Sequence, residues 1–345
     1  MKNLANLTVI VPSYNRQNLA LDTLNFWSKL NLNLSIHLVD GSEKPIENSK
    51  LSYLSNNIKY HHINTISEIK RVKKILHLVN TKYCVLGADD DLLLPNALSK
   101  SVHFLEKNSD FSSCYGQVLN FKNNDNQNQF YENKPNLKNF ALLSEDKNKR
   151  LKKNGLKPVH FCILSVMRTN IFKMIFDVNN YEPISYYATL ELRANMLVPY
   201  FGKCIAIPDL ILLRNKNSTP IIHRNNSNIS LFKFLFYNNK KKEFELFISS
   251  LVKLLDEDKK NAEKIIKKAL FYHLFFDIQR YVAVKVPNII FNNIKFLYLL
   301  KRKKKDKRIV ALQDLKEFCN KKKIKLDEED LKVVKEKFNH IKSIK

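Results

Sequence analysis

Short apolar runs that alternate with helical stripes occupy the first hundred residues of the chain. Residues 7–12 (LTVIVP) form an apolar, β-branched run closed by a proline, which is typical of a strand buried on both faces of a parallel sheet. Residues 18–30 repeat apolar side chains at helical spacing, and residues 34–42 (LSIHLVDGS) form a second apolar run that stops at Asp40. This order predicts a β-α-β unit at the N-terminus.

The alternation continues as far as three consecutive aspartates. Residues 58–63 predict a short third strand, and residues 65–79 predict a helix that begins with capping-box spacing between Thr65 and Glu68. Residues 83–91 (YCVLGADDD) predict a further strand that ends in the aspartates. The fold expected is a Rossmann-like, mostly parallel α/β sheet, which collects ligands beyond the carboxyl ends of its strands.

The aspartate triplet allows two interpretations. Adjacent carboxylates repel one another and are tolerated where water, a helix N-terminus or a divalent cation neutralises them. Asp89, Asp90 and Asp91 could therefore contribute to a metal site, or they could form a turn that caps the helix expected over residues 92–105.

Three ordered motifs carry a resemblance to a known family. VPSYNR, LVDGS and ADDDLLLP, at the ends of the first, second and fourth predicted strands, resemble the nucleotide-sugar glycosyltransferases of the GT-A fold, family two in particular. The resemblance covers roughly residues 7–224. It implies a catalytic domain over residues 1–225, and it implies that the following residues surround the nucleotide: Pro12, Ser13, Tyr14, Asn15, Arg16, Asp40, Arg71, Asp89 and Asp90.

The resemblance also assigns individual roles. Asp40 would contact the base, Asp89 would lie near the ribose, and Asp91 would bind Mn²⁺ or Mg²⁺, with Asp89 and His223 as further metal ligands. Ala88 stands where the commonest family motif has its first aspartate, which leaves the ligand assignment within the triplet open. A structural or exposed role is the alternative for His223, and an exposed helix face is the alternative for Arg71.

An inverting transferase needs a general base for the acceptor hydroxyl. Family members commonly use an acid of a Glu-Asp motif, but Ala188 and Thr189 occupy that place here, so Glu191 and Glu182 are the candidates. The alternative for Glu191 is an ion pair with a buried arginine, Arg193 for example. The missing motif also leaves open a degenerate transferase that serves as a scaffold.

The donor implied is a nucleotide sugar with UDP favoured, while GDP, dTDP and CDP stay open. The acceptor implied is a glycan or lipid-linked glycan of a bacterial surface polysaccharide, such as a capsule or lipooligosaccharide. The predicted activity is therefore metal-dependent, inverting glycosyl transfer.

The charge of the chain motivates a competing class of function. Fifty-nine Lys and Arg against 33 Asp and Glu give +26, a field that attracts nucleic acid, anionic membranes or phosphorylated molecules, although a Lys-rich and Asn-rich composition explains part of it. The chain carries no RNP, zinc-finger or helix-turn-helix signature, so we expect no nucleic-acid partner. A basic nucleic-acid-binding or membrane-surface protein is the alternative to the enzyme.

Residues 226–345 predict an appended, basic helical domain. Within it, residues 289–308 join an aromatic, apolar stretch to a cationic run. This combination suits anionic lipid, and the alternative is a core helix followed by a solvated linker. Residues 120–157 read as a polar surface loop. Five scattered cysteines and the lack of a long apolar run predict a cytoplasmic location, with peripheral attachment to the inner face of the plasma membrane left open.

Overall fold

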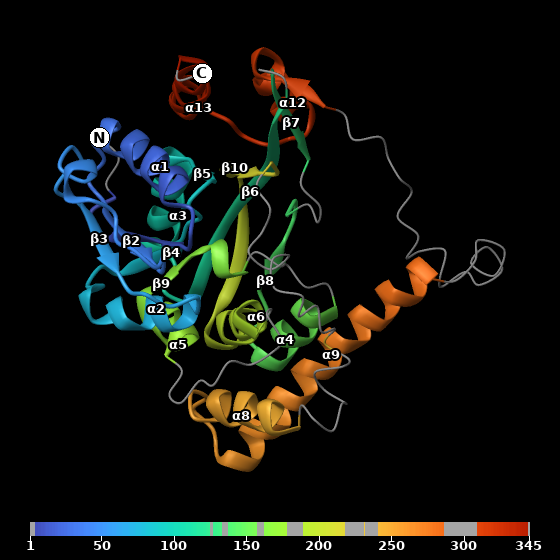
Figure 1. Cartoon of the computed structure of the whole chain (residues 1–345). Helices are drawn as coiled ribbons and strands as arrows, with labels where there is room; N and C mark the ends of the chain where they lie inside the picture. The colour runs from blue at the N-terminus through green and yellow to red at the C-terminus, as the bar shows by residue number, and fades with distance from the viewer. Residues whose placement is uncertain are drawn as a thin grey trace.

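The computed structural model describes residues 4–124, 127–132, 137–156, 162–177, 189–217, 231, 241–285 and 309–343. Helices flank a single large sheet, as Figure 1 shows. The strands are β1 (Leu7–Ser13), β2 (Ser35–Asp40), β3 (Ile58–His62), β4 (Tyr83–Leu86), β5 (Leu92–Leu93), β6 (Phe111–Asn124), β7 (Gln127–Glu132), β8 (Ala141–Leu142), β9 (Val166–Arg168), β10 (Lys203–Asn215) and β11 (Val310–Ala311). The helices are α1 (Gln17–Lys29), α2 (Glu68–Ile75), α3 (Pro95–Lys107), α4 (Lys147–Leu156), α5 (Thr169–Phe176), α6 (Thr189–Phe201), α8 (Lys241–Val252), α9 (Lys259–Lys285), α12 (Leu315–Lys321) and α13 (Glu328–Ser343).

The sheet has a parallel part and a mixed part. Strands β3, β2, β1 and β4 are adjacent and parallel, with Ser13 opposite Asp40 where β1 and β2 end. β9 then runs antiparallel to both β4 and β6, and β6 pairs in parallel with β10. The predicted α/β sheet is confirmed, with antiparallel strands added beyond β4.

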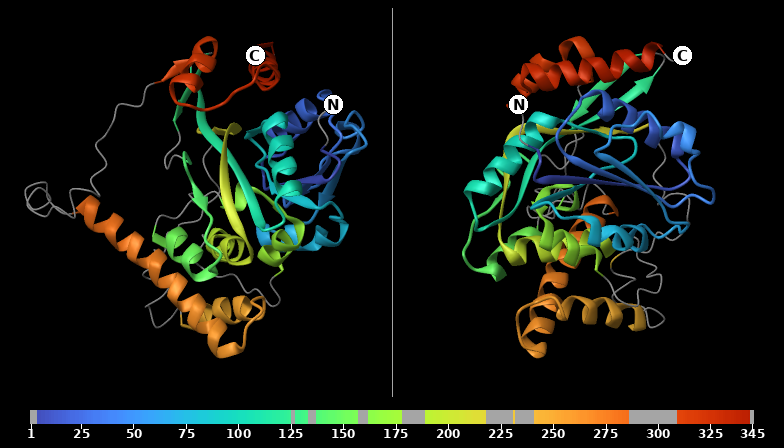
Figure 2. Two further views of the ribbon diagram at one scale, coloured as in Figure 1. Left: turned by 180° about the vertical axis from the view of Figure 1, so that it is seen from behind. Right: turned by 90° about the vertical axis from the view of Figure 1, so that its left-hand side faces the viewer.

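Alternate residues of the strands feed two apolar cores, one on each face of the sheet. On β1, Ile10 packs in one core, while Val9 and Val11 pack in the other. Helices α2, α4, α5, α6, α8 and α9 contribute to the first core, and α1, α3, α12 and α13 contribute to the second. Figure 2 shows the two groups of helices on opposite sides of the strands. Strands buried on both faces account for the uninterrupted apolar runs of the sequence.

The local start of α2 differs from the prediction. Its N-cap is Ser67, whose hydroxyl accepts a hydrogen bond from the Lys70 N–H at 3.3 Å, whereas Thr65 accepts from the N–H of Ser67 at 3.4 Å. The capping box between Thr65 and Glu68 was therefore wrong. Ser67 is the N-cap because it directly precedes Glu68, the first helical residue.

The described part of the polar segment 120–157 is not a surface loop. It holds the second half of β6, the antiparallel strand β7, the short strand β8 and helix α4. Buried side chains such as Phe130 and Leu151 join the two cores, so spaced apolar residues outweigh the polar composition.

The C-terminal region contains the expected helices and also a strand. β11 pairs with β7, and α12 and α13 pack in the same core as α1 and α3. The predicted boundary at residue 225 lies outside the described residues, as do residues 289–308, so the division into two domains stays a prediction. All five cysteines are buried free thiols. In the part of the chain that the structure describes, no helix is long and apolar enough to cross a membrane.

Candidate functional site

Polar residues from three strands meet at the carboxyl edge of the parallel part of the sheet. The Gly41 N–H donates to the Ser13 carbonyl oxygen at 2.9 Å, and the Gly87 N–H donates to the Ile10 carbonyl oxygen at 2.8 Å. These bonds hold the chain just beyond β2 and β4 against the end of β1. The predicted clustering of residues 13–16, Asp40 and the aspartate triplet is therefore what the fold produces.

Two of the aspartates are tied to the segment after β1. Asp89 is 3 % exposed, accepts a 2.9 Å hydrogen bond from the Ser13 hydroxyl and lies 3.1 Å from an Arg16 guanidinium nitrogen. The other terminal nitrogen of Arg16 lies 2.6 Å from Asp90. Burial nevertheless raises the pKa of Asp89 to about 6, because the Arg16 charge and the Ser13 bond offset only part of the desolvation.

Asp91 is less well compensated. Its Oδ1 accepts the Asn215 N–H at 2.8 Å, which links the triplet to the end of β10. Burial raises the pKa of Asp91 to about 7, and the like charge of Asp90 adds to this, against the weaker opposing effects of the Asn215 bond and of Arg214 and Lys216.

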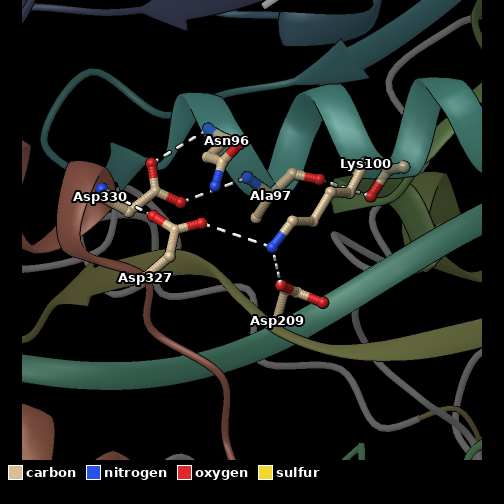
Figure 3. A network of polar contacts seen from close by, with 7 residues as sticks. Asn96, Ala97, Lys100, Asp209, Asp327 and Asp330 are labelled. Atoms are coloured by element: carbon tan, nitrogen blue, oxygen red, sulfur yellow. Dashed lines mark hydrogen bonds and ion pairs between the residues drawn. The ribbon is translucent and has the colours of Figure 1, made fainter.

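The helix-cap reading of the triplet is wrong. Helix α3 starts at Pro95, three residues after β5 begins, and its N-cap residue is Leu94. The N–H groups of Asn96 and Ala97 donate to Asp330 of α13, at 3.0 and 3.2 Å, as Figure 3 shows. A distant aspartate therefore caps α3.

Asp40 is wholly buried and accepts four hydrogen bonds. One carboxylate oxygen accepts from the backbone N–H and the hydroxyl of Ser42, at 2.9 and 2.6 Å, and the other accepts from Gln17 Nε2 at 2.7 Å and the Tyr60 hydroxyl at 2.9 Å. Four donors fill the usual acceptor positions of a carboxylate. The role of Asp40 on the base stays a prediction, and a direct contact requires Gln17 or Tyr60 to move aside.

Arg71 is buried at 1 % exposure, so the exposed-face alternative was wrong for it. Its guanidinium donates to the Thr65 carbonyl oxygen at 2.6 Å and lies 5.8 Å from the centre of the Tyr14 ring. Desolvation lowers its pKa, while Glu68, Asp40, Tyr14 and Asp89 act in the opposite direction. A Cβ at Gly41 would lie 2.4 Å from this guanidinium, which explains why a glycine follows Asp40.

The rest of the segment after β1 forms the rim of the site. Asn15 adopts a positive φ of 54°, which asparagine tolerates, and its N–H donates to the Ser42 hydroxyl at 2.9 Å. Pro12 and Tyr14 are partly exposed, and Asn15 is exposed. This segment and the one after β2 are thus joined through Ser42.

Two glutamates, Glu68 at the start of α2 and Glu191 near the start of α6, lie near the same region. Both helices pack in the first core. Burial raises the pKa of Glu191, in the first turn of α6, to about 7, with Arg214 lowering it and Glu68 raising it further. Burial also raises the pKa of Glu68, against the effect of Arg71 and with that of Asp89. Sequence reasoning treated Glu68 only as a helix-capping residue, although its place just beyond β3, at another strand end, was the available signal.

Arg193, the alternative partner of Glu191, and Arg168, a second arginine considered for that role, both donate hydrogen bonds to other groups. Arg193 donates to the carbonyl oxygens of Ile175 and Met174 and to the Ser250 hydroxyl. Arg168 donates to the carbonyl oxygens of residues 105, 108 and 111. Both guanidiniums thus bind backbone carbonyls, as structural arginines do. Glu182 and His223 lie outside the described residues, and their roles stay predictions.

The described acidic residues fit only part of a metal site. Among them, no group of three or more His, Cys, Asp and Glu side chains is arranged to hold an ion. Asp90 and Asp91 are adjacent, and their mutual repulsion raises the pKa of Asp91, which a cation would reverse. One or two carboxylates completed by phosphate oxygens and waters are a common set for Mg²⁺. The residues therefore fit a cation shared with a diphosphate.

Solved structures resemble this fold. One is S. aureus TarS 1–349 in complex with UDP-GlcNAc, with TM-score 0.53 and 14 % identity over 82 % of this chain and 76 % of that one. Another is the same protein in complex with UDP, with TM-score 0.51 and 15 % identity over 97 % of this chain and 91 % of that one. TarS is a GT-A-like glycosyltransferase, so the predicted GT-A-like fold is confirmed. No family model and no curated protein sequence matches the chain.

Proposed function

We propose that this chain transfers a sugar from a nucleotide-diphosphate donor to a glycan hydroxyl. The observation that carries the proposal is the meeting of Arg16, Arg71 and the aspartate triplet beyond β1, β2 and β4 of a GT-A-like sheet. In open α/β sheets this edge is where nucleotides bind. The similar structure of TarS contains UDP-GlcNAc, which supports a UDP-sugar as the donor.

The residues at the edge divide between binding and orientation. Tyr14 is partly exposed beside buried Arg71, a pairing suited to hold a planar base while the guanidinium carries positive charge toward the diphosphate. Asp89 holds Arg16, and Asp40 holds Ser42 and Gln17, so these two acids keep the segments after β1 and β2 in place. We retain Asp40 and Asp89 as candidates for contacts with the base and ribose.

Asp90 and Asp91 would hold a divalent cation together with the donor diphosphate. When bound, Mn²⁺ or Mg²⁺ neutralises the charge that develops on the leaving nucleoside diphosphate. Asp89 and His223 stay proposed further ligands.

Glu191 is the proposed general base. A carboxyl with a pKa near 7 is ionised often enough to accept a proton at neutral pH and basic enough to do so efficiently. With the base on the acceptor side, the hydroxyl oxygen attacks the anomeric carbon opposite the leaving group, the glycosidic bond to the diphosphate breaks, and the configuration inverts. Glu182 is the second candidate, and Glu68, which faces both Glu191 and Asp89, joins them on electrostatic grounds.

The acceptor is proposed from the resemblance of the sequence. It would be a growing surface glycan of a bacterium, free or lipid-linked, with capsule and lipooligosaccharide as examples. A cytoplasmic enzyme that works at the inner face of the membrane would suit such an acceptor.

Isothermal titration of UDP, GDP, dTDP and CDP tests the proposal. Each nucleotide is added to the chain with Mn²⁺, with a chelator, and to the Asp91→Ala variant. Asp110→Ala is the matched control, since Asp110 directly precedes β6, at the N-terminal end of that strand, and pairs with Lys203. Binding of one nucleotide that needs both metal and Asp91 supports the proposal and identifies the donor class.

Failure of every nucleotide to bind would contradict it, and salt-sensitive binding to nucleic acid that ignores Asp91 would favour the alternative class. Donor binding without transfer or hydrolysis would identify a degenerate scaffold.

A further inference from the structure

The outward side of α9 carries one continuous stripe that begins basic and ends apolar. The exposed positions of this side recur every three or four residues, which places them on one face of a helix. We name this set the α9 stripe: Lys260, Lys264, Lys268, Phe271, Phe275 and Ile278.

The apolar half of the stripe is unusually exposed for its size. Phe271 is 60 % exposed, Phe275 40 % and Ile278 41 %, and the two phenyl rings stack with their centres 6.5 Å apart. The opposite face of the same turns is buried in the first core, with Leu270 and Leu274 as examples. A helix that is apolar on both sides has one side that the described part of its fold leaves exposed.

The packing of α9 turns this stripe outward. α9 lies against α4, where Gly155 approaches so closely that a Cβ there would be 2.6 Å from the Cβ of Tyr272. Figures 1 and 2 show α9 at the periphery, with its C-terminal half directed away from the sheet. The stripe therefore lies on the side of α9 opposite its buried face.

Charge decides which partner the stripe fits. None of its six positions is acidic, its first half holds three lysines, and the whole chain carries +26. A second copy of the chain would have to bury these lysines without carboxylates from the same stripe. Anionic headgroups would pair with the lysines, while the acyl boundary beneath them would take the phenyl rings.

We propose that the α9 stripe docks the protein on an anionic membrane surface, with Phe271 and Phe275 entering the headgroup region and Lys260, Lys264 and Lys268 lying on it. The sequence places the basic run 301–308 after α9, which adds charge of the same sign. The inference does not depend on glycosyl transfer, because lipid binding and nucleotide binding are measured separately.

Co-sedimentation of the full chain with vesicles tests it. We expect binding to vesicles of phosphatidylglycerol and phosphatidylcholine, and at least tenfold weaker binding to phosphatidylcholine alone. Phe271→Ser/Phe275→Ser should weaken binding to the anionic vesicles by about tenfold or more, since each ring loses its apolar contact. Tyr53→Ser/Leu143→Ser, which removes two side chains that are 53 % and 52 % exposed elsewhere, is the matched control and should bind as the parent does.

A charge series complements the aromatic one. Lys260→Gln/Lys264→Gln/Lys268→Gln should weaken binding by about tenfold or more and reduce its salt dependence. The control changes three exposed lysines outside α9, Lys82, Lys107 and Lys335, to glutamine. This comparison separates the stripe from net charge, because each triple variant loses three positive charges.

A fluorescent variant reports insertion directly. Phe275→Trp should shift its emission to shorter wavelength on anionic vesicles, against the constant background of Trp27, which is 5 % exposed. The proposal is overturned if this emission does not move, or if the Phe271→Ser/Phe275→Ser variant binds as tightly as its control. It is also overturned if the stripe variants abolish a dimer in sedimentation while the parent ignores lipid.

Discussion

Two acidic clusters lie on either side of the start of α3, and they differ in how their charge is compensated. The C-terminal cluster consists of Asp327, just before α13, and Asp330, in the first turn of α13. The other cluster is the aspartate triplet before β5. Asp330 accepts hydrogen bonds from two N–H groups of α3. Asp327 accepts a hydrogen bond from the Asp330 N–H at 2.9 Å, and its carboxylate lies 3.4 Å from the Lys100 ammonium. Figure 3 shows Asp330 bonded to the start of α3 and Asp327 bonded to Lys100.

In the triplet, burial and the like charge of Asp90 act on Asp91 more strongly than the groups that oppose them. Asp91 accepts one backbone N–H and lies beside Asp90, and its pKa rises to about 7. The aspartate triplet is close to the start of α3 in sequence, yet Asp330 caps that helix. Proximity in sequence to a helix start therefore does not identify the capping residue. We infer that the C-terminal cluster stabilises the fold. The triplet instead serves to bind a ligand, and it lowers the free energy of unfolding.

The largest expected effect is at the triplet. Asp91→Ala should lower transfer activity by at least about 100-fold, since a ligand to the proposed cation is lost. Its unfolding free energy without nucleotide should be unchanged or slightly higher, because a poorly compensated buried charge is removed. Activity assays and chemical denaturation of the same preparation measure both quantities.

Added nucleotide and Mn²⁺ sharpen this prediction. They should raise the melting temperature of the parent and leave that of Asp91→Ala where it was. A variant that loses activity and also several kcal/mol of stability would instead place Asp91 with the structural acids.

Glu191 should show a dependence on pH of the same kind as the triplet. Its pKa of about 7 in the folded chain exceeds the value of a free glutamate, so the stability that its proton supplies is present at low pH and is lost as pH rises from about 4.5 to 7. The charged groups that face it are Arg214 and Glu68. Relative to the parent, Glu191→Gln should gain about 1–3 kcal/mol of unfolding free energy between pH 4.5 and 8.

Activity provides the second readout for Glu191. The parent should gain activity as pH rises through about 7, and Glu191→Gln should lose most of it at every pH. Glu182→Gln is the control. If Glu182→Gln is the inactive variant instead, the general base is Glu182, and the raised pKa of Glu191 is a consequence of burial without a catalytic role.

The sequence predicted the site through its strand ends. Continuous apolar runs located β1, β2 and β4, and parallel pairing then required Ser13, Asp40 and Asp89 to meet. Local patterns were sufficient here because each residue lies directly after its strand.

Long-range contacts were outside the reach of such patterns. The cap of α3 by Asp330 joins residues more than two hundred positions apart, and the pairing of β11 with β7 is similarly distant. Glu68 was missed as a site residue because the sequence marks it as an ordinary first-turn acid, and only folding brings it toward Asp89 and Glu191.

The cap of α3 has a smaller expected effect than the triplet, and on stability only. Asp330→Ala should lower the unfolding free energy by about 1–2 kcal/mol, because two N–H groups of α3 lose a charged acceptor. Asp330→Asn keeps an acceptor oxygen and should recover part of this. Nucleotide affinity of the folded fraction, measured by titration, should match the parent. An Asp330→Ala variant with full stability but weakened nucleotide binding would contradict the assignment of the C-terminal cluster to stability and of the triplet to ligand binding.

Lys100 should give the smallest effect. Its ammonium lies 2.6 Å from Asp209 and 3.4 Å from Asp327, and so joins β10 to the C-terminal cluster, but the side chain is 44 % exposed. Water and salt screen such a pair, so Lys100→Met should cost less than about 1 kcal/mol, and the cost should shrink further as salt is raised. Denaturation at low and high ionic strength measures this, with Lys107→Met as the control on the exposed end of the same helix. A loss of several kcal/mol that salt does not reduce would mean that Lys100, rather than the helix cap by Asp330, is what anchors the C-terminal cluster to α3.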